Sequence, residues 1–397
     1  MKILYITDAE EKYGAATSFK EMVVTLKENY NVEPIVLTSI NGELNKFLDE
    51  NEIENHAIGH EAILINTPSN KIKRYIKLNI LKKYYKNKIL NKNMEAIKKA
   101  GEIVDFDKID LIHTNVNRID IGIRLAKKYH IPHIMHLREF SDLDFNLAPV
   151  TMSYKKFYGF MNEYTNSFIA ISNVIKENFI KKGIDKDKIR IIYNGISNYD
   201  FIDKNRFDDN KTHIVMTSSI GDTKGQMDAV RAINLLKDDE KRKIKFDIYG
   251  DGDKKYIGEI KNYINKNKLN DIIELKGYSN NINSIIGKYD IGLMCSKSEA
   301  FGRVTAEYMN AGLIVIASNT GANPEIINDN QNGYLYNKKD VRTLTEQIEK
   351  IINNDINKNI EIRKNAINKV KNNFTKEINA KNVYNLYKEI LEKRSNK

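Results

Sequence analysis

The segment at residues 291–327 constrains the fold most strongly, because it reads as a strand, a helix and a second strand in direct succession. An apolar run at residues 291–295 is typical of a fully buried strand, and a second apolar run follows at residues 313–317. Between them a helical pattern starts near Gly302 and ends at a turn at Gly312. Two parallel strands need such a crossover, since a tight hairpin joins only antiparallel strands. The segment therefore predicts a βαβ unit of a parallel sheet.

The loop between the first strand and the helix, residues 296–302, is where we expect a ligand, because open α/β sheets bind ligands outside the carboxyl ends of their strands. Gly302 allows the backbone to approach a ligand closely, and the N–H groups around Gly302 and Arg303 suit a diphosphate. Glu299 and Glu307 would repel that phosphate unless they face hydroxyl groups, so these residues together fit a nucleotide sugar. The spacing of the two glutamates is by itself a weak signal, since most such pairs are solvated.

Alternating apolar runs and helical patterns extend through the rest of the chain. In the first half, strands are expected at residues 3–6, 34–37, 111–113, 133–136, 168–171 and 189–192. This alternation predicts a parallel, doubly wound α/β sheet. The polar stretch at residues 197–211 reads as a linker, and a new strand follows at residues 213–216. We therefore predict Rossmann-like domains at residues 1–200 and 201–374, and a final helix at residues 375–397 whose apolar face must be buried.

The length and composition limit the other possibilities. The chain has 397 residues, enough for two domains that each have a core. No apolar run approaches the roughly 20 residues that a transmembrane helix requires, and the opening residues MKILYITDAE lack the apolar region of a signal peptide. We therefore expect a cytoplasmic protein. The single cysteine, Cys295, excludes an internal disulfide, and its place in an apolar strand predicts a buried, inert thiol.

Much of the net charge of +11 lies in an insert at residues 66–100. Residues 71–99 contain eleven Lys or Arg side chains and a single acidic residue, Glu95. Apolar and basic residues separate into two faces over residues 71–80, and again over 81–90 about half a turn out of phase. This pattern predicts two short amphipathic helices, or one helix kinked near residue 80, on an anionic membrane surface. A basic solvated helix is the alternative, and no nucleic-acid partner is expected because no motif that reads nucleic acid accompanies the charge.

The residues around the predicted ligand loop resemble the donor-binding segment of the retaining GT-B glycosyltransferases of family 4. The match comprises Glu299, Phe301, Gly302, Glu307, the Ala311-Gly312 turn and the segment Gly321-Ala322-Asn323-Pro324-Glu325. The resemblance is greatest to the bacterial branch that builds capsular and other surface polysaccharides, and it covers the chain except residues 66–100. It implies the GT-B fold, in which two Rossmann-like domains face a central cleft and the final helix crosses back to the first domain. It also implies that no metal or cofactor is required.

The resemblance assigns roles on the donor side. Lys224 and Arg303 would bind the diphosphate. Glu307 would bind the ribose hydroxyls, and Glu299, as a catalytic residue, the hydroxyls of the sugar. Further donor contacts are expected at Gly14, Gly225, Gly250, Tyr278, Phe301 and Gly302.

The chain departs from the family pattern at two donor-side positions. Ala15 replaces one of two paired glycines, and Ser219 stands where an arginine is usual. Serine cannot supply charge, so either Lys224, Arg303 and the helix dipole suffice or catalysis is weaker. Asp251 and Asp253 have the spacing of a metal-binding pair, but they fall in a family turn, and we expect no metal there.

Polar residues at strand ends are the candidates on the acceptor side. His113 matches a family histidine thought to contact the transferred sugar, which makes it the second catalytic candidate, although a histidine at a strand end can equally be structural. The string from His136 to Arg138 and Glu139 also resembles the capsular branch. Arg138 and Glu139 would orient acceptor hydroxyls or a lipid phosphate, or they would pair with each other. The residues at 194–195, Asn-Gly, predict a tight turn with positive φ.

The resemblance implies a retaining glycosyltransferase on the inner face of the plasma membrane. It would move a sugar from a nucleotide diphosphate, with UDP as the expected nucleotide, to a hydroxyl of a lipid-linked glycan. The departing phosphate would take the proton of the acceptor hydroxyl. Two alternatives remain: a GT-B nucleotide-sugar epimerase, and a non-catalytic partner subunit, which the serine at position 219 would suit.

Overall fold

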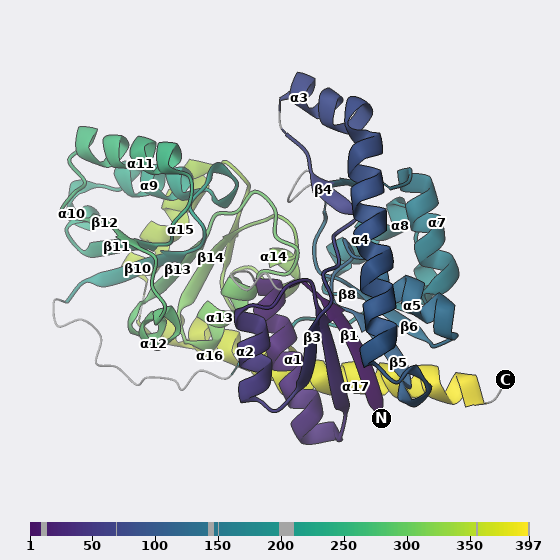
Figure 1. Ribbon diagram of the computed structural model, residues 1–397. Coiled ribbons are helices and arrows are strands. Elements are labelled where there is room, and N and C mark those ends of the chain that lie inside the picture. The colour runs from purple at the N-terminus through teal and green to yellow at the C-terminus, as the bar shows by residue number, and fades with distance from the viewer. Residues whose placement is uncertain are drawn as a thin grey trace. The chain divides into compact units, whose positions relative to one another are not determined.

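The structure is a computed structural model that describes residues 1–8, 14–68, 70–141, 147–149, 151–197, 210–354 and 356–395. The chain divides into two compact units (Figure 1). Unit 1 comprises Met1–Gly195 together with Lys376–Lys397, and unit 2 comprises Ile196–Thr375. Most of the expected linker at residues 197–211 lies outside the described residues.

Unit 1 is built on a seven-stranded sheet in the order β3-β2-β1-β5-β6-β8-β9, and its neighbouring strands run parallel. The strands are β1 (Lys2–Thr7), β2 (Glu33–Thr38), β3 (Glu54–Ala57), β5 (Leu111–Thr114), β6 (His133–Leu137), β8 (Ser167–Ala170) and β9 (Ile189–Ile191). The strand order reverses at β1 and β5, as in a doubly wound fold. A separate antiparallel pair joins β4 (Leu64–Asn66) to β7 (Leu147–Pro149). The predicted α/β class is confirmed.

Helices cover both faces of this sheet, and each face has its own core. Along β1, Ile3 and Tyr5 belong to one cluster, while Leu4 and Ile6 belong to the other, because successive strand residues point to opposite faces. The helical elements of unit 1 are α1 (Gly14–Tyr30), α2 (Glu43–Glu50), α3 (Lys71–Tyr75), η1 (Ile76–Ile80), α4 (Lys82–Ile103), η2 (Phe106–Lys108), α5 (Ile121–Tyr129), α7 (Tyr154–Tyr164), α8 (Asn173–Lys181), η3 (Lys186–Lys188) and α17 (Lys376–Ser395). The apolar face of α17 lies in the same core as β1 and α1.

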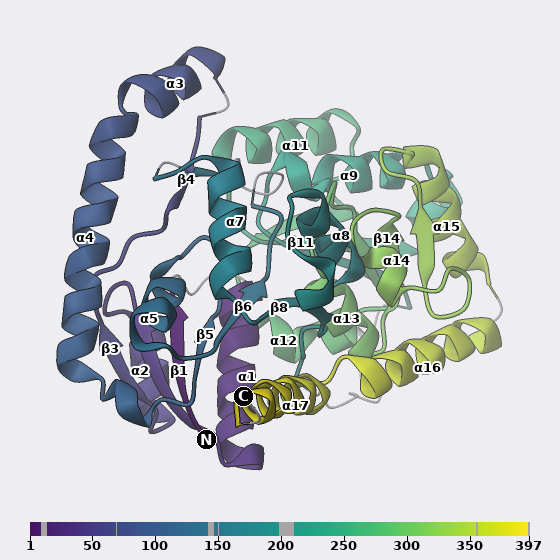
Figure 2. The same cartoon turned by 90° about the vertical axis from the view of Figure 1, so that its right-hand side faces the viewer.

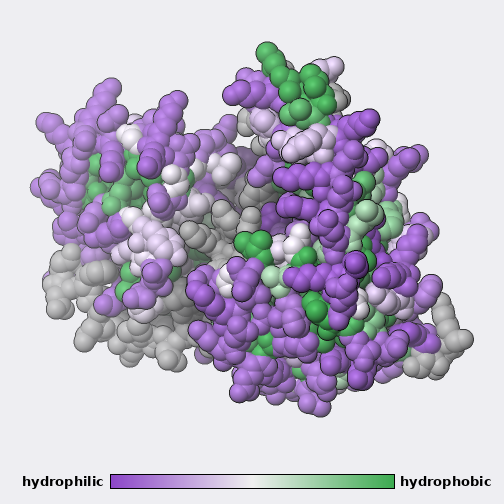
Figure 3. All heavy atoms as spheres, in the orientation of Figure 1, coloured by the Kyte–Doolittle hydropathy of each residue, from purple (hydrophilic) through white to green (hydrophobic). Residues whose placement is uncertain are grey.

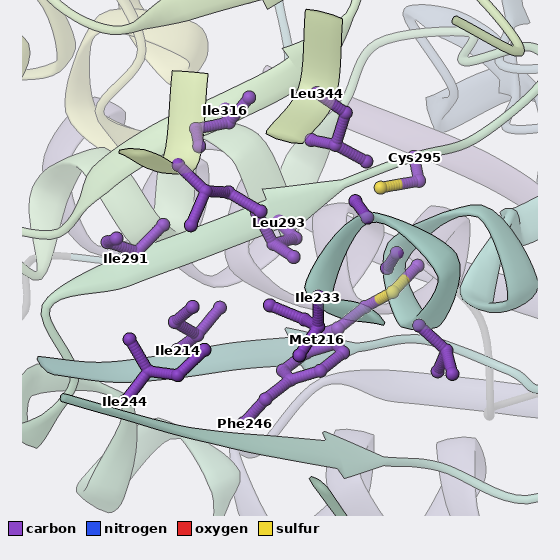
Figure 4. Packing of buried hydrophobic residues seen from close by; sticks show 14 of the residues in the cluster. Ile214, Met216, Ile233, Ile244, Phe246, Ile291, Leu293, Cys295, Ile316 and Leu344 are labelled. Carbon is purple, nitrogen blue, oxygen red and sulfur yellow. The ribbon is translucent and has the colours of Figure 1, made fainter. Parts of the chain in front are cut away.

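Unit 2 contains a six-stranded parallel sheet in the order β12-β11-β10-β13-β14-β15. Its strands are β10 (Thr212–Thr217), β11 (Ile244–Tyr249), β12 (Ile273–Gly277), β13 (Ile291–Met294), β14 (Ile314–Ser318) and β15 (Tyr334–Tyr336). Its helical elements are η4 (Asp222–Lys224), α9 (Gln226–Leu235), α10 (Asp238–Lys241), α11 (Lys254–Lys266), α12 (Ile282–Ile285), η5 (Ile286–Lys288), α13 (Arg303–Asn310), α14 (Asn323–Ile326), α15 (Val341–Asn353) and α16 (Ile356–Asn373). Figure 4 shows side chains of neighbouring strands packing with Ile233 and Leu344 from helices. Cys295 belongs to this core, and burial raises the pKa of its thiol to about 12.

The predicted βαβ unit is present as β13, α13 and β14. Tyr308 of α13 lies against Gly292 of β13, where an added Cβ would stand 2.2 Å from the tyrosine ring. The same tyrosine hydroxyl donates a hydrogen bond to Thr217 Oγ1 at 2.9 Å. The crossover helix is therefore fixed to two strands of the sheet.

One local prediction was wrong. The Asn-Gly pair at residues 194–195 does not have positive φ, since neither residue is among those with left-handed backbone. Gly195 is needed for another reason: an added Cβ would lie 2.5 Å from Lys376 Cα, where α17 begins. Tyr278, one of the expected donor contacts, directly follows strand β12.

The basic insert forms a helical arm that consists of α3, η1 and the first part of α4. Figure 2 shows α4 running along one side of unit 1 with α3 at its end. Between them, η1 is a π-helix, followed by Leu81 with ψ near 0°, so the regular helix is interrupted where the sequence predicts a kink. In the described parts of the chain, no helix is both long enough and apolar enough to cross a bilayer.

Candidate active site

The loops at the carboxyl ends of the unit 2 strands contact one another closely at glycines. An added Cβ at Gly225 would lie 2.2 Å from the carbonyl oxygen of Cys295. At Gly250 it would lie 1.9 Å from the carbonyl oxygen of Ser218. Both glycines also have positive φ, 76° and 140°, which other residues rarely adopt. The loops after β10, β11 and β13 therefore meet through close backbone contacts that only glycine permits.

Lys224 and Glu299 form an ion pair across two of these loops. The distance from Lys224 Nζ to Glu299 Oε1 is 2.8 Å, and the two side chains are 29% and 14% exposed. The Glu299 carbonyl accepts a hydrogen bond from Ala322 N at 2.9 Å. Gly321 packs on the same backbone, since its Cβ would be 2.1 Å from the Glu299 carbonyl oxygen. The loop after β14 thus fixes the glutamate that faces Lys224.

A second ion pair stands at the start of α13. Arg303 Nε lies 2.7 Å from Glu307 Oε1, one helical turn away, and both side chains are less than 15% exposed. The helix begins at Arg303, and the residue before it, Gly302, has a φ of 88° and no side chain to cap the helix. Each cation predicted to bind diphosphate is therefore held by one of the two predicted carboxylates. The positive end of the helix dipole adds to this site.

Asn323 and Gln226 also shape the site, although neither was among the predicted site residues. Asn323 accepts a hydrogen bond from Thr305 Oγ1 at 3.0 Å and lies beside Gly302. It therefore joins the loop after β14 to the first turn of α13. Gln226 is fully buried and donates to Ser218 Oγ and to the Ser219 carbonyl, both at 2.9 Å. No sequence signal distinguishes such a clamp from an ordinary helix residue, whereas Asn323 falls within the family string.

Phe301, Tyr278 and Ser219 differ in how far their side chains are exposed. Phe301 is only 3% exposed and its ring packs edge-to-face on Phe374 at 5.7 Å, so its side chain belongs to the core. Tyr278 is 72% exposed and follows Gly277, which has a φ of 72°. Ser219 is exposed.

The Asp251 and Asp253 pair has local structural partners. Asp253 caps α11 by accepting hydrogen bonds from Lys255 N and Tyr256 N at 2.9 and 3.2 Å. Asp251 accepts one from Gly252 N. Among the described residues, no group of three or more His, Cys, Asp or Glu side chains is placed to hold a metal ion.

In unit 1, the predicted acceptor-side residues His113, His136 and Arg138 lie near the carboxyl ends of β5 and β6. His113 Nδ1 is 2.6 Å from Tyr387 Oη, and its Nε2 is 3.2 Å from His136 Nδ1. Burial, reinforced by the charge of Arg138, lowers the pKa of both histidines far below the usual range. His113 is fully buried, and both of its ring nitrogens are engaged by these two partners.

Arg138 is held by two amides that sequence reasoning missed. Its Nε donates to Asn115 Oδ1 and its Nη1 to Asn194 Oδ1, both at 2.7 Å. These bonds are distant in sequence, so no local pattern shows them. Glu139 is partly exposed beside it. Gly14, the remaining candidate, is the first residue of α1, and residues 9–13 before it lie outside the described residues.

Comparison with known proteins agrees with this architecture. Residues 56–198 match the model of Glycosyltransferase Family 4, and residues 198–389 match that of Glycosyl transferases group 1. An uncharacterized glycosyltransferase of Methanocaldococcus jannaschii is 28% identical over 266 residues, which are 66% of this chain and 71% of that protein. The Escherichia coli UDP-Gal:alpha-D-GlcNAc-diphosphoundecaprenol alpha-1,3-galactosyltransferase is 25% identical over 309 residues, covering 73% and 78% of the two chains.

The fold also matches solved structures over nearly its full length. Anabaena HepE in complex with UDP superposes with a TM-score of 0.75 and 19% identity, covering 98% of this chain and 100% of the other. At that identity the likeness concerns the fold. Two glycosyltransferase family models together match residues 56–389, and the chain is similar in sequence to glycosyltransferases and in fold to the solved structure of Anabaena HepE.

Proposed function

We propose that the protein is a retaining glycosyltransferase that moves a hexose-type sugar from UDP to a hydroxyl of a lipid-linked glycan in surface polysaccharide synthesis. The observation that carries this proposal is the pairing of Lys224 with Glu299 and of Arg303 with Glu307 on loops locked at the carboxyl end of the unit 2 sheet. Such a site offers two fixed cations for a diphosphate and two carboxylates for hydroxyl groups. The name of the Escherichia coli relative contains a UDP-sugar and a lipid diphosphate, and the Anabaena protein was solved with UDP, which supports the choice of donor and acceptor class.

The ion pairs hold the two cations of this site in place before the donor binds. A lysine or arginine with a free side chain would lose conformational entropy on binding phosphate, whereas Lys224 and Arg303 already occupy defined positions. When the diphosphate binds, its oxygens would share the two cations. Glu299 would then accept hydrogen bonds from sugar hydroxyls, and Glu307 from the ribose.

The proposed reaction uses electrostatic stabilisation of the leaving group. The bond from the anomeric carbon to the phosphate oxygen breaks through an oxocarbenium-like state, and its electron pair goes to the phosphate. Lys224, Arg303 and the N–H groups at residues 302–303 would stabilise that charge. The acceptor hydroxyl forms the new bond on the same face and gives its proton to the departing phosphate, which retains the configuration. We propose that no metal or cofactor takes part.

Incubation with a panel of nucleotide sugars, scored by UDP release with and without saccharide acceptors, tests this proposal. Acceptor-dependent release of UDP is the expected result. Conversion of the free UDP-sugar without any acceptor would instead indicate an epimerase. Binding of UDP-sugar without hydrolysis or transfer, under all acceptor conditions, would indicate a non-catalytic partner subunit.

The basic arm would place the enzyme at its acceptor. Figure 3 shows apolar surface gathered over α3 at the end of the arm. Its exposed apolar residues are Ile72, Tyr75, Ile76, Ile80, Leu81 and Tyr84, which are 38–72% exposed. Lysines at residues 73, 77, 82 and 83 lie among them. Apolar side chains beside lysines favour an anionic lipid surface, so we propose peripheral binding through residues 71–99 to the cytoplasmic face of the plasma membrane.

A further inference from the structure

A chain of four buried rings links the last helix to the acceptor-side strands of unit 1. Tyr387 Oη of α17 lies 3.2 Å from Tyr5 Oη of β1 and 2.6 Å from His113 Nδ1 of β5. His113 Nε2 then lies 3.2 Å from His136 Nδ1 of β6. All four residues are fully buried, so water does not compete for these hydrogen bonds.

The geometry determines which atom donates and which accepts in each hydrogen bond between these four rings. The Tyr387 hydroxyl donates its single hydrogen to Tyr5 Oη, so towards His113 it must accept. His113 therefore carries its proton on Nδ1. Because His113 is neutral, its Nε2 is bare and accepts the proton of His136 Nδ1. His136 is neutral as well, so its own Nε2 also carries a lone pair and no hydrogen.

His136 Nε2, at the far end of these four rings, makes no hydrogen bond within the described parts of the chain. Among the described residues, no hydrogen-bond partner reaches His136 Nε2, although this atom is buried. A buried acceptor without a donor is unfavourable, and such atoms call for an explanation. His136 lies near the carboxyl end of β6, the edge at which doubly wound sheets bind ligands. The nearby charge of Arg138 disfavours a cation there, which leaves a neutral hydrogen-bond donor.

We propose that Tyr387 is a positioning residue that sets the tautomers of His113 and His136, so that His136 Nε2 accepts a hydrogen bond from a hydroxyl of the bound acceptor saccharide. This inference rests on the proposed transferase function for the identity of the ligand. The residue that contacts the acceptor is His136, and His113 connects it to Tyr387. The C-terminal helix thereby becomes part of the acceptor site without touching substrate.

Proton-detected two-bond NMR of ¹⁵N-histidine-labelled full-length protein tests the proton order directly. The chain has 7 histidines, so substitution of single histidines can assign each ring. We expect His113 and His136 to be protonated at Nδ1 and bare at Nε2. In Tyr387→Phe the acceptor of the His113 Nδ1 proton is removed, so both histidines should switch to Nε2–H. A wild-type protein with Nε2–H on either ring, or an unchanged pattern in Tyr387→Phe, would overturn the proposal.

Tyr384→Phe is the matched control. Tyr384 lies on the same helix and its ring is tilted against Tyr30 at 4.7 Å, so this change removes a hydroxyl while keeping the packing of α17. It should leave the tautomers and the activity unchanged. Equal thermal stability of the two variants would show that Tyr387→Phe does not act through unfolding.

Ligand titration separates the hydroxyl from an ordered water. Glucose, galactose, N-acetylglucosamine and short-chain lipid-diphosphate saccharides are added to the labelled protein. A shift of the His136 Nε2 resonance with at least one saccharide is expected. If no saccharide shifts this resonance, the assignment of the ligand as a saccharide hydroxyl is wrong.

Kinetics give the independent readout. Tyr387→Phe should lower kcat/KM for the acceptor about tenfold, as for the loss of one hydrogen bond, and leave KM for the nucleotide sugar unchanged. An equal loss in donor KM, or no loss, would contradict the inference. If the wild type transfers no sugar while the tautomers and the saccharide shift are as expected, the transferase proposal fails and the histidine arrangement stands.

Discussion

Lys224 and Glu299 stand 75 positions apart in the chain and form an ion pair of 2.8 Å at the carboxyl end of the unit 2 sheet. The pair joins the loop after β10 to the loop after β13. It also brings a predicted phosphate-binding cation within reach of a predicted sugar-binding carboxylate. The activity of the site should therefore depend on the charge of Glu299 and on the backbone that holds it.

Glu299→Gln should abolish most of the activity while leaving the fold intact, because the amide keeps the size of the side chain and loses its charge. We expect kcat for UDP release to fall by about 10²- to 10³-fold, the magnitude typical of a lost transition-state contact. Glu259→Gln is the control, since Glu259 belongs to an exposed pair with Lys255 on α11. Equal activity of the two variants would remove Glu299 from the mechanism.

Gly321→Ala should displace Glu299 without touching its side chain. Gly321 has a φ of 57°, and an added Cβ would lie 2.1 Å from the Glu299 carbonyl oxygen. We expect a loss of about 1–3 kcal/mol in stability and a fall in kcat, measured by thermal unfolding and UDP release. Gly258→Ala is the control, because that helical glycine has nothing within 4 Å of its Cβ position and the change should stabilise α11 by up to about 1 kcal/mol. If Gly321→Ala is as active as Gly258→Ala, the loop contact does not position the carboxylate.

Replacing Lys73, Lys77, Lys82 and Lys83 by Gln should weaken binding to vesicles that contain anionic lipid. Each lysine near the surface contributes about 1 kcal/mol, so the fourfold variant should dissociate at moderate salt. Co-sedimentation with vesicles measures this, and UDP affinity should not change. Leu235→Ser removes an exposed apolar residue of unit 2 and serves as the control. Unaltered sedimentation of the lysine variant would rule out the arm as the membrane contact.

Stability should fall as the pH decreases from about 7 to 5. Burial lowers the pKa of His133 to about 3 and of His60 to about 4, and it also lowers the pKa of His113 and His136 well below the usual range. An unfolded histidine has a pKa near 6.5, so below that pH the unfolded chain binds more protons and each histidine lowers the free energy of unfolding by about 1.4 kcal/mol per pH unit. Burial raises the pKa of Asp120, which has the opposite sign and offsets at most one proton.

Thermal unfolding across this pH range measures the effect. His133→Gln removes one of the four titrating groups, so it should make the dependence of the unfolding temperature on pH shallower. A flat profile between pH 7 and 5 in the wild type would contradict the neutral state of these histidines.

Treatment with EDTA should leave UDP release unchanged. In the proposed reaction the leaving diphosphate is stabilised by Lys224, Arg303 and backbone N–H groups, and no step is assigned to a metal. Activity with and without EDTA, followed by addition of Mg²⁺ or Mn²⁺, makes the comparison. Loss with EDTA and recovery with either ion would require a metal at the diphosphate.

The fold was largely predictable because it follows from local patterns. The apolar runs that became β13 and β14 are short and continuous, as buried parallel strands are, and the helix between them begins directly after a glycine. Strand β3 was missed because its sequence, ENHA, is polar and half-exposed at the edge of the sheet. The burial of the Phe301 side chain could not be predicted, because an aromatic residue in a ligand loop looks the same in sequence whether it faces a ligand or the core.

The connections within the site could not be predicted from sequence. His113 and Tyr387 are 274 positions apart, and nothing near either residue indicates the other. The glycines at positions 225, 250 and 321 were recognisable as turn residues, but their close contacts with other loops depend on the packing of the sheet. Family resemblance named Lys224, Glu299, Arg303 and Glu307, whereas only the structure shows how they pair.

The π-helical turn at Ile76–Ile80 has a consequence for the basic arm. A π-turn accommodates one residue more than an α-turn, and one residue corresponds to a rotation of about 100° around a helix axis. The turn therefore compensates much of the phase difference between the two halves of the arm. It brings their apolar faces towards a common plane. Deleting a single residue from this turn would restore a regular α-helix and rotate α3 out of that plane.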